Sequence, residues 1–131
     1  MIESAKEFVR LRNSDQPEEY HRATWEEAPV EVWMEVIEHH PDMVRWVAHN
    51  KSIPKELIRL LAQHPDSDVR FFIAAKRKTP QDVLQKLTRD LCDSIRMQVA
   101  VNAKSSRETL QILINDPCDQ IRERVHKRLG E

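Results

Sequence analysis

Residues 46–54, WVAHNKSIP, place an indole, an imidazole, a carboxamide and an amine close together in the chain. Side chains of these types transfer protons and bind anions, so the stretch could form a catalytic or binding cluster. A polar turn between two helices has the same composition and needs no such role. The residues that would carry a function here are Trp46, His49 and Lys51.

The stretch recurs twice at a constant interval, as FIAAKRKTP at 72–80 and QVAVNAKSS at 98–106. The two later copies have alanine, valine or arginine where the first has His49 and Lys51. A recurring turn therefore explains the stretch, and specialisation of the first copy through Trp46 and His49 is the alternative. The other half of the unit recurs at nearly the same interval as MVR (43–45), DVR (68–70), SIR (94–96) and QIR (120–122).

Four arginines belong to these segments, and each follows an aspartate by two or three residues. A row of arginines could bind phosphate groups. An aspartate that caps a helix and pairs with the arginine of a stacked unit gives the same pattern, and we favour this structural ladder. The arginines are Arg45, Arg70, Arg96 and Arg122, and the nearby acids are Asp42, Asp68, Asp93 and Asp119.

Cysteines and histidines give no metal-binding pattern. Cys92 and Cys118 occupy the same position of consecutive units. Stacked helices lie about 8–10 Å apart, whereas a disulfide needs Cα atoms within about 7 Å, so we expect free thiols. Two cysteines cannot supply a four-thiolate site, and the six histidines include no His-x-x-x-His pair. We expect neither a metal nor a cofactor.

Composition excludes further chemistry. Gly130 is the one glycine in 131 residues, so phosphate-binding loops, dinucleotide fingerprints and nucleophile elbows cannot form. The net charge of −1 gives no overall bias toward nucleic acid or anionic membranes, although residues 1–41 carry ten acids against four Lys and Arg. No apolar run approaches the roughly 18 residues of a membrane span, and the start has no signal-peptide core. We expect a cytoplasmic protein.

Prolines and apolar spacing predict two helices in each unit. The second helix opens with a proline and has an acid two residues later, as in Pro80 and Asp82. Thr79-x-x-Asp82 and Ser105-x-x-Glu108 read as capping boxes that strengthen these starts.

The first helix of each unit is short, and either α or partly 3₁₀. Asn50 and Asn102 fall where it ends, and asparagine tolerates the left-handed backbone of a helix stop. Ala74 and Ala100 should be buried where helices pack closest. The other apolar residues expected in these helices are Val69, Phe72, Ile73, Ile95, Val99, Ile121 and Val125.

Two units, HPDSDVRFFIAAKRKTPQDVLQKLTRD and DLCDSIRMQVAVNAKSSRETLQILIND, resemble the leucine-rich repeat variant (LRV) pattern D-x-x-x-V-R-x-x-V-A-x-N-x-x-x-P-x-x-x-L-x-x-L. The LRV family is related to HEAT-like α-solenoids. The resemblance covers about residues 40–129, and the leading part looks like small bacterial proteins of this type. It implies a right-handed stack of short helices used for binding. Some LRV proteins carry an iron–sulfur cluster on a cysteine-rich segment, which this sequence does not contain.

The outward positions of the second helices form the candidate binding surface. They are polar and mildly basic in the later units. In the leading unit they are apolar, so the N-terminal segment or a partner must cover Val30 and Met34. We expect this surface to bind another protein that has an apolar anchor beside acidic groups. The partner-binding residues are Val30, Met34, Lys55, Arg59, Gln85, Arg107 and Gln111.

These observations predict an all-α fold, a right-handed α-solenoid of about four two-helix repeats, each of roughly 25–26 residues, with an N-terminal capping helix. The expected function is non-catalytic protein–protein interaction, in a bacterial adaptor or a toxin-neutralising immunity protein. A nucleic-acid-binding HEAT-like module is the alternative, and an enzyme built on Trp46 and His49 is the third possibility. The single domain would comprise a cap at 1–15, repeats at 16–39, 40–63, 64–89 and 90–115, and a C-terminal helix at 116–131.

Overall fold

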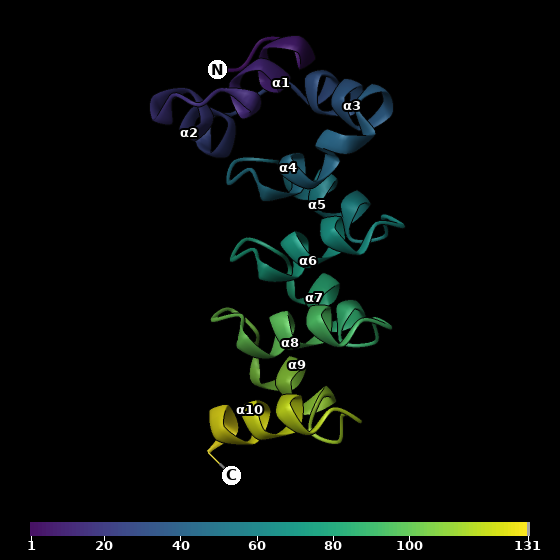
Figure 1. Ribbon diagram of the computed structural model, residues 1–131. Coiled ribbons are helices and arrows are strands. Elements are labelled where there is room, and N and C mark those ends of the chain that lie inside the picture. Colours follow the sequence, from purple (N-terminus) through teal and green to yellow (C-terminus); the bar gives the residue numbers. More distant parts are fainter. Residues whose placement is uncertain (131) are drawn as a thin grey trace. The chain divides into compact units, whose positions relative to one another are not determined.

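The structure of the chain is a computed structural model that describes residues 1–130 (Figure 1). These residues contain ten α-helices, one short 3₁₀-helix and no β-strand. The predicted all-α class is therefore confirmed. By its internal contacts the chain divides into two compact units, residues 1–58 and the residues from Arg59 onward. We call them the N-terminal unit and the C-terminal unit.

The N-terminal unit contains α1 (Ala5–Asn13), α2 (Pro17–Trp25), α3 (Val30–His39), the 3₁₀-helix η1 (Pro41–Met43), α4 (Val44–His49) and the start of α5 (Lys55–Leu61). Its core centres on Phe8 and Trp33, which are fully buried and meet edge to face with ring centroids 5.1 Å apart. This geometry adds about 0.5–1.5 kcal/mol to the burial of the two rings. The buried indole N–H of Trp33 has no hydrogen-bond acceptor.

The N-terminal segment covers its own core but leaves part of α3 exposed. Ile2, Phe8 and Leu11 are fully buried. Val30, in contrast, keeps an exposed fraction of 38%, and Met34 is half-buried. The cover expected over these two residues is thus incomplete.

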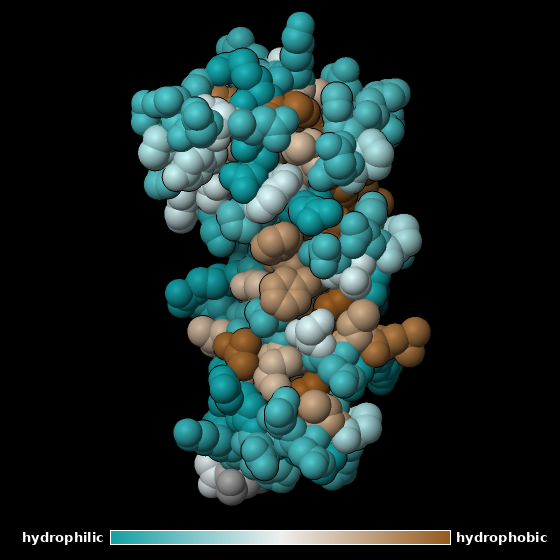
Figure 2. Space-filling view, viewed as in Figure 1, coloured by the Kyte–Doolittle hydropathy of each residue, from teal (hydrophilic) through white to brown (hydrophobic). Residues whose placement is uncertain are grey.

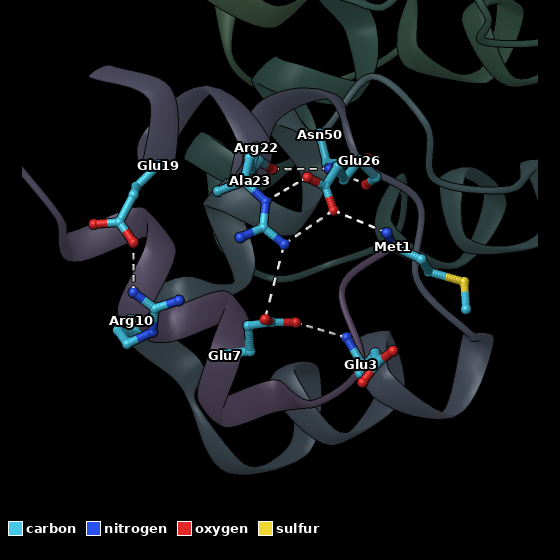
Figure 3. Close-up of polar contacts among 9 residues, drawn as sticks. All are labelled: Met1, Glu3, Glu7, Arg10, Glu19, Arg22, Ala23, Glu26 and Asn50. Atoms are coloured by element: carbon cyan, nitrogen blue, oxygen red, sulfur yellow. Dashed lines mark hydrogen bonds and ion pairs between the residues drawn. The ribbon is translucent and has the colours of Figure 1, made fainter. Parts of the chain in front are cut away.

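Ion pairs join α1 to α2 (Figure 3). The guanidinium of Arg22 pairs with Glu26 and reaches the carboxylate of Glu7 at 3.8 Å. Arg10 pairs with Glu19 at 2.6 Å. The hydrogen bond from Arg22 is the main cause that holds the pKa of Glu26 below its usual value. Because these side chains are partly exposed, the pairs fix the orientation of the helices more than they stabilise them.

The C-terminal unit contains α6 (Ser67–Ala75), α7 (Gln81–Leu87), α8 (Asp93–Val101), α9 (Arg107–Ile112) and α10 (Asp119–Leu129). Helix α8 packs against α6 and α10, and α7 packs against α9. Helices α6, α8 and α10 begin at a constant interval along the chain, so residues at this interval occupy equivalent places on neighbouring helices. The fully buried residues of these three helices are Val69, Ile73, Ala74, Ile95, Val99, Ala100, Ile121 and Val125.

The short first helices are α-helical, and 3₁₀ geometry is limited to Pro41–Met43 before α4. Ala74 and Ala100 are buried, as predicted. Phe72 departs from the prediction, because it lies beside the buried stripe of Val69 and Ile73 and is only half-buried.

The predicted capping boxes are wrong. Helix α7 begins after Pro80 without a side-chain cap, and Ser106 caps α9 in place of Ser105. The hydroxyl groups of Thr79 and Ser105 donate instead to carbonyl groups six residues earlier, at the end of the preceding helix, each at 2.6 Å. The last carbonyls of a helix have no N–H donor within that helix. Each of these hydroxyls supplies a donor to one such carbonyl, Ile73 of α6 and Val99 of α8.

The prediction of left-handed backbone at Asn50 and Asn102 is also wrong. Their φ angles are −59° and −64°. Gly130 is the one described residue with a positive φ. The asparagines serve through their side-chain amides, as described next.

Candidate functional site

The arginines of α6 and α8 hold consecutive turns together. Arg70 pairs with Asp90, with Nε and Oδ2 2.8 Å apart, and Arg96 pairs with Asp116 at 2.9 Å. Each arginine thus reaches an aspartate 20 residues further along the chain. The side chains of Asp90 and Asp116 are only 7% and 3% exposed. Buried pairs of this kind fix register, because removing one partner leaves an uncompensated charge.

Backbone carbonyls accept further hydrogen bonds from Arg96 and from Arg122 on α10. Nη1 of Arg96 donates to the Asp90 carbonyl at 2.7 Å, and Nη1 of Arg122 donates to the Asp116 carbonyl. Arg96 also pairs with Asp93 of its own helix at 2.6 Å, whereas the predicted ladder joins Asp93 to the arginine of a stacked unit. Asp93 is 71% exposed, however, so the buried partners Asp90 and Asp116 carry the ladder. Arg70, Arg96 and Arg122 therefore have structural partners within the chain, and Arg45 is exposed.

Burial raises the pKa of Asp90, but the hydrogen bonds from Arg70 and from the backbone N–H of Cys92 outweigh it, and the net pKa lies below the usual value. The ionised carboxylate is therefore the form that the fold holds at neutral pH.

The same aspartates cap the turns before α8 and α10. Asp90 accepts the backbone N–H of Cys92 at 3.0 Å, and Asp116 accepts that of Cys118 at 2.9 Å. His64 does the same one unit earlier, where its Nδ1 accepts a backbone N–H at 3.0 Å. Both cysteines are half-buried free thiols at the equivalent N-cap position, as the sequence predicted.

A second recurring contact clamps the ends of the first helices. Nδ2 of Asn102 donates to the carbonyls of Ala74 and Lys76 at 2.8 and 2.9 Å. Arg128, at the equivalent position of the next unit, donates from Nη1 to the carbonyls of Ala100 and Asn102 at 2.7 and 2.8 Å. The longer arginine side chain suits this position because α10 continues through it without turning.

Asn50 makes the corresponding contact in the N-terminal unit. Its Nδ2 donates to the carbonyls of Ala23 and Glu26 at 2.8 and 3.0 Å, and its Oδ1 accepts the backbone N–H of Ser52 at 2.7 Å. The backbone N–H of Lys51 donates to the Thr24 carbonyl at 2.7 Å. The polar turn of residues 50–52 therefore fastens α4 to the end of α2.

Trp46 packs against both Arg12 and His49. The guanidinium of Arg12 lies 3.6 Å from the centre of the Trp46 ring, and the rings of Trp46 and His49 meet edge to face with centroids 5.6 Å apart. A cation over an indole contributes about 0.5–2 kcal/mol. This cluster ties α1 to α4. Trp46 and His49 are half-buried in it, whereas Lys51 is exposed.

The predicted surface of the second helices is partly occupied by contacts within the chain. Arg59 pairs with Asp82, and this hydrogen bond is the main cause that lowers the pKa of Asp82. Nη2 of Arg107 lies 3.4 Å from the Leu129 carbonyl. Among the other predicted members of this surface, Gln85 and Met34 are half-buried. Gln111, Val30 and Lys55 are exposed.

A surface that the sequence analysis missed lies on the first helices of the C-terminal unit. Phe71 and Phe72 on α6 and Met97 and Val101 on α8 are all half-buried, and Phe71 and Met97 occupy equivalent positions. We call these four residues the apolar face. Figure 2 shows hydrophobic side chains gathered where Figure 1 places α6 and α8. The available signal was four apolar residues outside the buried stripe.

Basic side chains lie at or just beyond the ends of α6, α8 and α10. Exposed Arg77 and Lys78 follow α6, exposed Lys104 follows α8, and exposed Lys127 lies near the end of α10. We call these four residues the basic edge. Met97 and Lys127 line one surface hollow of about 400 Å³, so the two features adjoin there.

Among the described residues, no group of three or more His, Cys, Asp or Glu side chains could hold a metal ion. None of the described helices has both the length and the apolar character needed to cross a membrane. Comparison of the chain with protein-family models, with curated proteins and with solved structures found no match.

Proposed function

We propose that this chain is a non-catalytic protein-binding module and that the apolar face with the basic edge is its binding site. The observation that carries the proposal is the partial exposure of Phe71 and Met97 at equivalent positions of α6 and α8, on helices whose polar residues are used to hold the fold. Aromatic residues, Met and Arg are enriched at protein interfaces. An acidic partner with an apolar anchor matches this surface in charge and character.

The scaffold that we propose for this site is a right-handed α-solenoid related to the LRV and HEAT-like repeats. Two contacts support it: the arginine–aspartate pairs that span 20 residues and the clamps that span 26 or 28 residues. Contacts at constant intervals are what a stack of similar units produces. Such stacks present equivalent positions of successive helices as one continuous surface.

The proposed function is tested by quantitative capture of proteins from extracts of the native organism, with a double variant on the site and a matched double variant elsewhere. Phe71→Gln with Met97→Gln should reduce the recovery of any specific partner at least tenfold. Glutamine is a good helix former, so the helices should persist. Leu60→Gln with Ile112→Gln changes two exposed apolar residues of the second helices and should leave recovery unchanged. Equal recovery by both double variants would refute the proposed site.

Nucleic acid is the second candidate partner, and the four cations of the basic edge are the observation that favours it. Duplex DNA binding through these cations would weaken with a slope of about −0.9 per phosphate contact in a plot of log K against log salt. Fluorescence anisotropy with a labelled duplex across a salt series measures this slope. We expect no specific binding at physiological salt, because Phe71, Phe72 and Met97 would gain nothing from a phosphate backbone. A steep slope that Lys78→Glu with Lys104→Glu abolishes would favour nucleic acid.

A further inference from the structure

The N-terminal unit carries two exposed apolar residues within an acidic stretch of the sequence. Trp25, at the end of α2, is 62% exposed, and Val30, at the start of α3, is 38% exposed. Residues 13–44 contain nine acids against a single Lys or Arg, which is Arg22. Arg22 is itself paired with Glu26 and close to Glu7. Glu26 also binds the N-terminal ammonium at 3.1 Å, and the exposed Lys51 donates its backbone N–H to the Thr24 carbonyl. The exposed acids that lie nearest Trp25 in the sequence are Glu27 and Glu31.

The apolar face of the C-terminal unit has the opposite surroundings. Residues 69–107 contain nine Lys and Arg against three acids. Each of these acids is paired with an arginine of the same unit: Asp82 with Arg59, Asp90 with Arg70, and Asp93 with Arg96. Three members of the basic edge lie in this segment. The fourth, Lys127, lines the hollow beside Met97 together with Arg124 and Glu123.

We propose that a second copy of this chain is an occupant of the apolar face and that it docks through Trp25. The identification of the apolar face as a binding surface rests on the proposed function. Charge and the type of anchor favour a second copy as the occupant. Trp25 is followed in the sequence by the exposed acids Glu27 and Glu31. The half-buried aromatic residues of the apolar face are followed in the sequence by the cations of the basic edge. Tryptophan is among the residues that carry most of the energy of an interface.

The proposed contact joins two different surfaces, because each copy offers one Trp25 surface and one apolar face. Two such contacts close a dimer if they are reciprocal, and single contacts extend into open chains if they are not. Attraction between charged surfaces weakens as salt is added, since the Debye length falls from about 10 Å at 0.1 M to about 3 Å at 1 M. Occupation by a second copy also covers the face that an external partner needs, so self-association and partner binding compete.

The test is sedimentation equilibrium of the purified full chain over concentrations of about 1–500 µM, the range in which weak association becomes visible. We expect the average mass to rise from the monomer mass of 15.5 kDa at low salt and to rise less at high salt. Trp25→Gln should raise the dissociation constant at least tenfold. Phe71→Gln with Met97→Gln should do the same, whereas Leu60→Gln with Ile112→Gln should not change it.

A mixing experiment decides whether the two surfaces meet each other. A Trp25→Gln chain keeps its apolar face, and a chain with Phe71→Gln and Met97→Gln keeps its Trp25. Each variant alone should stay monomeric, but an equimolar mixture should associate, because one intact pair of surfaces remains. A mixture that stays monomeric while the wild-type chain associates would overturn the pairing. A wild-type chain that stays monomeric throughout would overturn it as well.

These results are distinguishable from failure of the proposed function. If the chain is monomeric yet loses its external partner upon Phe71→Gln with Met97→Gln, the binding site stands and the second copy is not its occupant. If self-association behaves as expected, Trp25→Gln should recover more external partner than the wild type. Recovery that falls with Trp25→Gln would contradict the competition.

Discussion

Residues 1–58 and the residues from Arg59 onward order short helices by different means. The N-terminal unit depends on an aromatic pair, Phe8 and Trp33, and on ion pairs that occur once. The C-terminal unit depends on two polar contacts that recur at constant intervals. The comparison teaches that charged side chains can look like a site in the sequence while serving only to hold successive turns in register.

The largest effect should come from the aromatic core of the N-terminal unit. Phe8→Ala removes a fully buried ring and should lower the free energy of unfolding by about 3–5 kcal/mol. Phe71→Ala, at a half-buried position, should cost less than half as much. Urea denaturation followed by circular dichroism measures both. Equal costs would mean that Phe71 belongs to a core and that the apolar face is not a surface.

The second effect tests whether buried ion pairs hold the C-terminal unit. Asp116→Ala leaves Arg96, which is itself only 9% exposed, without its buried partner and should cost about 3 kcal/mol in the free energy of unfolding. Asp119→Ala is the matched control, because Asp119 is 80% exposed where it pairs with Arg122. The same denaturation assay should find the control close to the wild type. A control as costly as Asp116→Ala would show that exposed pairs matter equally.

The asparagine clamps offer the closest comparison between the two units. Asn102→Ala and Asn50→Ala each remove a side-chain donor from two carbonyl groups and should each cost about 1–3 kcal/mol. Similar losses in thermal or urea unfolding would show that one clamp serves both units. A loss confined to Asn102→Ala would mean that the turn at Asn50 is held by its other contacts.

The smallest effect depends on pH. The folded-state pKa of Asp90 lies below its usual value, so the carboxylate stabilises the fold above the unfolded-state pKa of about 3.9 and loses this contribution as pH falls through the folded-state pKa. Asp90→Asn should therefore cost about 1–2 kcal/mol at pH 7 and progressively less below about pH 4. A difference from the wild type that stays constant down to pH 3 would contradict this role.

The sequence predicted the features that recur at the constant interval between units. The positions of the helices, the buried alanines and the equivalent cysteines could be predicted, because the same position in each unit has the same environment. The sequence analysis missed Asp90 and Asp116 as partners, since their separation from the arginines is 20 residues and crosses between units.

Side-chain direction explains the other errors. The sequence pattern predicts that Thr79 and Ser105 cap the next helix, but their hydroxyl groups donate to the previous one. Phe72 was expected in the core, yet Val69 and Ile73 already fill the buried stripe of α6. The binding surface predicted on the second helices stays a prediction, and the apolar face could be recognised only once the buried positions were known.

The most direct test of the central claim is a lysine acetylation footprint of the chain with and without its captured partner. Lys78, Lys104 and Lys127 of the basic edge should react at least threefold more slowly in the complex. Lys55 and Lys86 lie exposed on the second helices and should react as in the free protein. Protection of Lys55 and Lys86 with an unchanged basic edge would contradict the account and move the binding site to the second helices.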